Sequence, residues 1–121
     1  MAKKYWGYHM MIDAAGCDPK SISDSEHIKS FARDLVSEIQ MKAFGEPVAV
    51  HFADHDAEKA GYTLYQLIET SMISAHFVDI SADAYLDVFS CVEFDLDAVE
   101  QCFRAYFNPT SARVSFLTRQ A

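Results

Sequence analysis

The feature that most restricts the fold is a series of short strand-like segments between residues 48 and 91. The expected strands are 48–52, 61–71, 73–78 and 84–91, and fewer than a dozen residues separate each from the next. A parallel pair needs a crossover of a dozen residues or more, so strands joined this tightly are expected to pair antiparallel.

Two segments with helical spacing flank this series. Residues 23–43 repeat apolar side chains on one stripe, and Ser23 with Glu26 forms a capping-box pattern at the start. Residues 95–107 carry a second stripe, and Asp95 is the expected N-cap. Further strands are expected at 5–14 and 113–117. We therefore expect one α+β domain over residues 1–121, a two-layer sandwich of an antiparallel sheet with two main helices on one face.

The second face of such a sheet also needs cover. Aromatic residues occur on both faces of several expected strands, which favours a homodimer through the open sheet face. The formal charge of −8 and the lack of a Lys/Arg stripe argue against a nucleic-acid partner. No apolar run approaches the length of a membrane span and no signal peptide is recognisable, so we expect no membrane partner and a cytoplasmic location.

Metal and disulfide chemistry find little support. Three widely spaced cysteines and no CxxC motif argue against a disulfide framework or a cysteine zinc site. His51 and His55 lie close together with aspartates, but no recognised ligand spacing completes a site, and a polar strand end explains them as well. We expect no metal.

One nucleophile, one imidazole and one thiol stand within 21 residues: Ser71, His76 and Cys91. Taken alone, this trio is a weak signal, and Cys91 also fits a core cysteine at a strand end. Stronger information comes from four motifs in register along the chain. They are Gly7-Tyr8-His9-Met10-Met11, Gly16-Cys17-Asp18-Pro19, the Ser71/His76/Cys91 spacing, and Asp87-Val88-Phe89-Ser90-Cys91.

On these motifs the chain resembles the bacterial and archaeal S-adenosylmethionine decarboxylases, the small pyruvoyl-dependent kind. The resemblance implies self-cleavage between Thr70 and Ser71, which converts Ser71 into a pyruvoyl cofactor that forms a Schiff base with the substrate. It also implies that His76 is the base in processing and Cys91 the proton donor in decarboxylation. Thr63 stands eight residues before Ser71, where the family has a second processing serine, and keeps the hydroxyl.

The implied substrate is S-adenosylmethionine, and the implied product, its decarboxylated form, feeds polyamine and spermidine synthesis. A sulfonium and an adenine both suit aromatic faces, for which Trp6, Tyr8 and Phe89 are available. Glu69 is a candidate carboxylate near the site, for a ribose or for charge balance, and a solvated strand carboxylate is the alternative.

Two residues beside the expected cleavage site depart from the family pattern. Thr70 and Met72 stand where the family usually has Glu and His. They leave two alternatives open. One is a diverged, unprocessed homologue that binds S-adenosylmethionine without decarboxylating it. The other is a pyruvoyl decarboxylase of arginine or ornithine.

Overall fold

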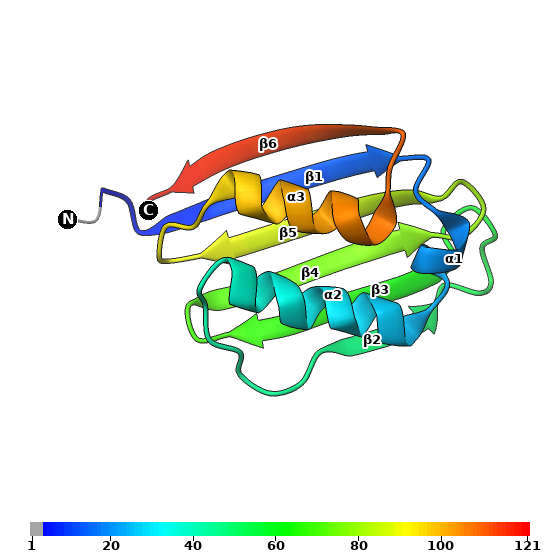
Figure 1. Ribbon diagram of the computed structural model, residues 1–121, viewed down its shortest axis with the longest axis horizontal. Helices are drawn as coiled ribbons and strands as arrows, with labels where there is room; N and C mark the ends of the chain where they lie inside the picture. The colour runs from blue at the N-terminus through cyan, green and yellow to red at the C-terminus, as the bar shows by residue number, and fades with distance from the viewer. Residues whose placement is uncertain (1–3) are drawn as a thin grey trace.

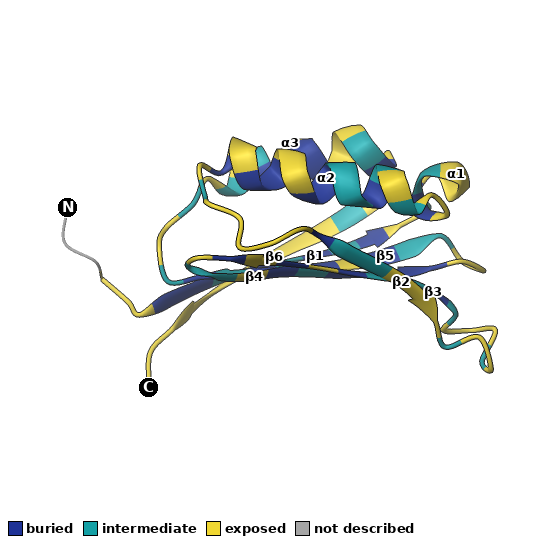
Figure 2. Ribbon diagram, turned by 90° about the horizontal axis from the view of Figure 1, so that it is seen from below, coloured by how far each residue is buried: buried dark blue, intermediate teal, exposed yellow. Residues whose placement is uncertain are grey.

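The computed structural model describes residues 4–121, which form one six-stranded sheet with three helices on one of its faces (Figures 1 and 2). The sheet order is β2-β3-β4-β5-β1-β6, and every neighbouring pair is antiparallel. The elements in chain order are β1 (Gly7–Ala15), α1 (Pro19–Ile22), α2 (Ser25–Glu38), β2 (Val48–Phe52), β3 (Gly61–Ile68), β4 (Ser71–Val78), β5 (Asp83–Ser90), α3 (Leu96–Phe107) and β6 (Ser111–Arg119).

The core lies between the sheet and the two long helices, which run side by side over it (Figure 1). Phe31 of α2 packs edge-on against Phe103 and Phe107 of α3, with ring centroids 5.9 and 4.9 Å apart. Phe107 also meets Phe77 of β4 at 4.8 Å, which ties the helix layer to the middle of the sheet. The expected α+β two-layer sandwich is confirmed.

The first long helix is shorter than its periodicity predicts. Asp24, rather than Ser23, caps its start by accepting hydrogen bonds from the backbone of Glu26 and His27. The Ser23 hydroxyl instead donates to Pro19 O, because Ser23 ends the short helix α1, which the sequence reading missed. The expected N-cap Asp95 of α3 is found in that role.

The chain leaves α2 at Ile39, and residues 41–44 run beside the end of β3. Glu69 N–H donates to Lys42 O and Phe44 N–H donates to Leu67 O, each over 2.8–2.9 Å. The apolar spacing of 23–43 continues past the helix because Met41 still packs against the core. This segment therefore braces the hairpin between β3 and β4.

The β3–β4 hairpin has an unusual backbone. Its loop consists of Glu69 and Thr70, since Ile68 pairs with Ser71. Two-residue hairpins favour turns with positive φ inside the loop. Here both loop residues keep negative φ, and the positive value, 156°, falls on Ser71. L-residues rarely adopt such a φ, so the hairpin concentrates backbone strain at the first residue of β4.

Within residues 4–121, the other face of the sheet carries no helix (Figure 2). Large apolar side chains on this open face are each between 41% and 54% exposed; they are Val50, Phe52, Tyr65, Leu67, Met72, Tyr85 and Leu117. An apolar surface of this extent on a small domain is typical of an interaction face.

Candidate active site

The peptide group between Thr70 and Ser71 lies against the end of β5. Ser71 is directly opposite Ser90 in the β4–β5 register. The backbone N–H of Cys91 donates to the Thr70 carbonyl oxygen over 3.0 Å. The structure therefore brings two of the expected site residues, Ser71 and Cys91, to the same peptide group. A carbonyl that accepts a fixed N–H is polarised toward nucleophilic attack.

The Thr70 side chain is held from two sides. Ser90 Oγ donates to Thr70 Oγ1 over 2.8 Å, and Thr70 Oγ1 donates to Met41 Sδ over 3.3 Å. Ser90 Oγ also accepts from Val92 N–H over 3.0 Å, and the residue is fully buried. Sequence reasoning missed Ser90, although a polar residue at a helix-facing position of an alternating strand was a signal for it.

Thr63 and His76 form a hydrogen-bonded pair on the open face. They are register partners in β3 and β4, and Thr63 Oγ1 lies 2.7 Å from His76 Nδ1. His76 Nε2 lies 2.8 Å from Lys59 O, which accepts only. Nε2 therefore carries the proton, and Nδ1 accepts the Thr63 hydroxyl hydrogen. This is a base held in one tautomer by a backbone carbonyl.

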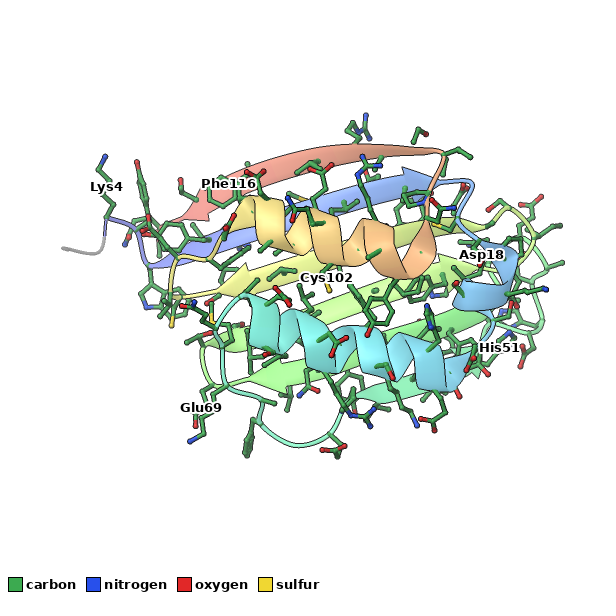
Figure 3. The ribbon with its side chains drawn as sticks, in the orientation of Figure 1. Lys4, Asp18, His51, Glu69, Cys102 and Phe116 are labelled. Carbon is green, nitrogen blue, oxygen red and sulfur yellow. The ribbon has the colours of Figure 1, made fainter. Side chains whose placement is uncertain are left out.

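The pair does not meet Ser71 within one chain. His76 stands five positions after Ser71 in β4, which corresponds to about 16 Å along a strand. Ser71 pairs across from the buried Ser90, whereas His76 lies on the open face. Figure 3 shows the same separation: Glu69, beside Ser71, lies at one end of the sheet, and His51, two strands from His76, lies at the other.

The three cysteines have different surroundings. Cys91 is half-buried at the end of β5, whereas Cys17 and Cys102 are 3% and 9% exposed. Burial, together with nearby carboxylates, raises the pKa of Cys17 and of Cys102 to about 11. Cys91 is thus the most accessible of the three cysteines, and the other two are packed in the core.

Two of the expected aromatic residues lie together. Trp6 and Phe89 have ring centroids 6.1 Å apart, and the Arg119 guanidinium lies 5.3 Å from the Phe89 ring. They line a hollow of about 390 Å³ with Gln120 and Ala121. Phe89 sits over Gly7, where an added Cβ would lie only 2.7 Å from the ring, so the absence of a side chain there makes room for it.

The expected Tyr8 lies elsewhere. Tyr8 is 3% exposed and stacks on Phe116 at 6.3 Å. It follows Gly7 on the helix-facing side of β1, because side chains alternate along a strand. The structure thus separates Tyr8 from Trp6 and Phe89.

Glu69 occupies the exposed tip of the β3–β4 hairpin. Its carboxylate lies 3.7 Å from Lys42 Nζ. With Phe44, Leu67, Ile68 and Ser71 it lines an open hollow of about 590 Å³. Glu69 is therefore close to Ser71 in space, and both positions follow from the same turn.

Two other histidines, His9 and His51, have carboxylate partners. His9 Nε2 lies 2.9 Å from Asp87 Oδ1 on the open face. His51 lies 2.8 Å from Asp54 and 2.6 Å from Asp79, and these contacts, chiefly the Asp79 hydrogen bond, raise the His51 pKa. Across residues 4–121 no group of three or more His, Cys, Asp or Glu side chains is arranged to hold a metal ion. Within the same residues, no helix is long and apolar enough to cross a membrane.

The sequence is similar to those of known proteins and matches a known protein family. The family model described as S-adenosylmethionine decarboxylase matches residues 8–120. The chain belongs to the S-adenosylmethionine decarboxylase family. The family resemblance drawn from the motifs is confirmed, and with it the assignment to a family of enzymes.

Two relatives and one solved structure show how close the similarity is. An S-adenosylmethionine decarboxylase proenzyme of Clostridium botulinum is 32% identical over 92 residues, which cover 73% of this chain and 71% of that protein. A proenzyme of the same name from Pyrococcus abyssi is 32% identical over 87 residues, 72% of this chain and 58% of that protein. The crystal structure of the adenosylmethionine decarboxylase from Aquifex aeolicus matches with a TM-score of 0.78 at 21% identity, covering 98% and 93% of the two chains. At that identity the structural match shows the fold.

Proposed function

We propose that this chain is a proenzyme that cleaves itself between Thr70 and Ser71 and then decarboxylates S-adenosylmethionine. The observation that carries the proposal is the hydrogen bond from Cys91 N–H to the Thr70 carbonyl oxygen. This carbonyl belongs to the peptide bond to Ser71, whose backbone is strained. The fold and the family support the same conclusion. The product, decarboxylated S-adenosylmethionine, would supply polyamine synthesis in the cytoplasm.

Cleavage begins at Ser71. Its hydroxyl oxygen attacks the Thr70 carbonyl carbon, the C–N bond breaks, and the hydroxyl proton moves to the Ser71 nitrogen, leaving an ester. A base then removes the Ser71 Cα proton, and the Thr70 carboxylate leaves Cβ. The remaining dehydroalanine tautomerises to an imine, and water hydrolyses the imine, which releases ammonia and leaves a pyruvoyl end. Residues 1–70 and 71–121 become two chains.

The residues around Ser71 fit a pyruvoyl group formed in place. Ser71 is partly exposed at the start of β4, and the half-buried Cys91 directly follows Ser90, the register partner of Ser71, so both residues lie at the same end of the sheet. A pyruvoyl carbonyl supplies an electron sink for the carbanion left by lost CO₂. Cys91 then holds the proton that returns to the substrate carbon.

We propose further that the site is completed by a second copy. Thr63 and His76 hold the geometry of an oriented base, yet they lie about 16 Å along the strand from Ser71. In this dimer the two open faces pack against each other, and the two-fold axis lies between them, perpendicular to the strands. The His76 end of one sheet then lies over the Ser71 end of the other. The exposed apolar residues of the open face would be buried in the same step.

The hollow beside Phe89 is the proposed place for the substrate. The Phe89 ring already attracts the Arg119 guanidinium at 5.3 Å, and a sulfonium is held by the same cation–π attraction. Trp6 offers a second aromatic face for the adenine. Glu69, near Ser71 in the neighbouring hollow, provides a carboxylate for a hydroxyl or a positive charge.

Mass spectrometry of the purified protein tests the cleavage. We expect two masses, for residues 1–70 and for 71–121 with a pyruvoyl end, and one intact chain for Ser71→Ala. Release of CO₂ from carboxyl-labelled S-adenosylmethionine, compared with labelled arginine and ornithine, tests the substrate. An intact wild-type chain that still binds S-adenosylmethionine by calorimetry would instead support the unprocessed homologue.

Co-expression of two differently tagged variants tests completion in trans. Ser71→Ala retains His76, and His76→Ala retains Ser71. In a mixed dimer the His76→Ala chain should be cleaved, because its Ser71 meets the His76 of the partner copy, and the Ser71→Ala chain should stay whole. If neither chain is cleaved while the wild type is, the site is assembled within one chain.

A further inference from the structure

The Thr70 side chain belongs to a series of hydrogen bonds that begins at Val92 N–H, next to Cys91, and passes through the Ser90 hydroxyl. We propose that Ser90 is a positioning residue for self-cleavage: its hydroxyl fixes Thr70 and the Cys91 peptide so that Cys91 N–H stays aimed at the Thr70 carbonyl oxygen. The inference rests on the proposed cleavage between Thr70 and Ser71, and extends it to a residue that supplies neither the nucleophile nor the base.

The geometry restrains both partners of the Cys91–Thr70 hydrogen bond. Val92 N–H donates to Ser90 Oγ over 3.0 Å, which closes a turn around Cys91 and orients its peptide. Ser90 Oγ in turn donates to Thr70 Oγ1 over 2.8 Å. The Ser90 hydroxyl thus orients the donor, Cys91 N–H, through its contact with Val92, and the acceptor, the Thr70 carbonyl, through its contact with the Thr70 side chain.

The far end of the series is also anchored. Thr70 Oγ1 donates to Met41 Sδ over 3.3 Å, and Met41 N–H donates to Val36 O of α2 over 2.9 Å. Ser90 has 0% exposure, so water does not compete for its hydroxyl. A fully satisfied buried network of this kind is rigid, and removing one member leaves the others unpaired.

Rigidity at this point affects the first step of cleavage. As Ser71 Oγ bonds to the Thr70 carbonyl carbon, the π electrons move to the carbonyl oxygen, which becomes an alkoxide. Cys91 N–H, 3.0 Å from that oxygen, stabilises the charge. The C–N bond then breaks as the carbonyl re-forms, and the proton lost by Ser71 Oγ ends on the Ser71 amine. Ser90 acts on this step only, because the later elimination leaves Thr70 as a carboxylate.

The pairing involves Thr70, one of the two departures from the family pattern. The family usually has Glu at the position of Thr70. An ionised carboxylate there could accept from Ser90 but could not donate to the Met41 thioether, as the Thr70 hydroxyl does. Thr70 and Ser90 are matched here as hydroxyl donor and acceptor. We infer that Thr70 preserves cleavage by taking its orientation from Ser90.

The test measures the rate constant for precursor cleavage in freshly synthesised protein, by mass spectrometry over time. Loss of one oxyanion donor slows acyl transfer by about 10²–10³-fold, and a misaligned donor by less. We therefore expect about 10–100-fold slower cleavage in Ser90→Ala and in Thr70→Val, no further slowing in the double variant, and recovery in Ser90→Thr. Ser74→Ala, a β4 serine outside the network, is the matched control and should cleave at the wild-type rate.

Hydroxylamine separates the two steps, because it attacks esters much faster than peptide bonds. His76→Ala should accumulate the ester, and hydroxylamine should split it. Ser90→Ala should form little ester, so hydroxylamine should not restore cleavage. This difference would not arise from a general loss of stability, which far-ultraviolet circular dichroism measures in the same samples.

The outcomes distinguish the two proposals. If the wild type is not cleaved, the proposed function fails and this inference fails with it. If the wild type is cleaved and Ser90→Ala matches it, or if the Ser90 and Thr70 effects are additive, only the role of Ser90 is overturned. Should Ser90→Ala fail to fold, Thr70→Val at the partly exposed turn decides: cleavage at the wild-type rate would overturn the proposal.

Discussion

The backbone at Ser71 allows a comparison between two substitutions that both prevent cleavage. Ser71→Ala and Ser71→Gly each remove the hydroxyl and leave an intact chain. They differ in how the residue tolerates a φ of 156°, which Gly adopts readily and Ala does not. If the hairpin stores strain at this position, the glycine variant is the more stable of the two.

The magnitude follows from two opposing terms. A residue other than Gly in a sparsely populated backbone region costs about 1–3 kcal/mol. Gly in a strand costs about 0.5–1 kcal/mol relative to Ala, because it loses more backbone entropy. The difference favours Ser71→Gly by roughly 1 kcal/mol, or about 4 °C in Tm for a chain of this size.

Urea denaturation followed by circular dichroism measures this difference at one fixed protein concentration. The matched control is Ser74, also in β4 but with negative φ. In the Ser71→Ala background, Ser74→Gly should be less stable than Ser74→Ala by about 0.5–1 kcal/mol. The reasoning is refuted if Gly is the less stable substitution at both positions.

Three further predictions concern the cysteines, the sheet edge and the open face. At pH 8, a thiol reagent should label Cys91 first. The pKa values of about 11 at Cys17 and Cys102 lower their thiolate fractions about 100-fold below that of an ordinary cysteine. Equal labelling rates for all three cysteines, or a fast phase that survives Cys91→Ala, would contradict this. The raised His51 pKa adds stability that is fully present below pH 6.5 and is lost as the pH rises through the raised value, so His51→Gln should flatten the pH dependence of unfolding in that range, and an unchanged profile would show that the Asp79 contact has no effect. Tyr65→Lys on the open face should shift sedimentation toward the monomer while Val92→Lys, equally exposed but outside the sheet, should not; the same mass for both variants would argue against a dimer through this face.

The sequence predicts the fold well where one physical signal dominates. Alternating residues identify the strands, and in β5 they separate Phe89 on the open face from the buried Ser90 as expected. The antiparallel pairing from β2 to β5 follows from the short connections, whereas β1 pairs with β5 and β6, which lie far from it along the chain. The helix boundaries were harder, because Ser23 and Asp24 are both good caps and only the competing contact with Pro19 decides between them.

The site is less predictable, since it depends on distances across strands. The family resemblance implied that Ser71 and His76 act together, but they are five positions apart in β4, which corresponds to about 16 Å along a strand. Tyr8 was named with Trp6 and Phe89 as an available aromatic residue, yet its position in β1 places it on the helix-facing side of the sheet. The partners of Thr70 come from Met41 and Ser90, 29 and 20 residues away, and no local pattern reports such contacts.

The side chains of Thr70 and Met72, the two departures from the family pattern, point to opposite faces of the sheet, and each matches the polarity of its surroundings. Thr70 turns toward the helix side, where Ser90 and Met41 hold its hydroxyl. Met72 turns to the open face across from Phe89, among the apolar side chains that a second copy would cover. Both departures are therefore accommodated by their surroundings, and the cleavage measured by mass spectrometry decides between a processed chain and an unprocessed homologue.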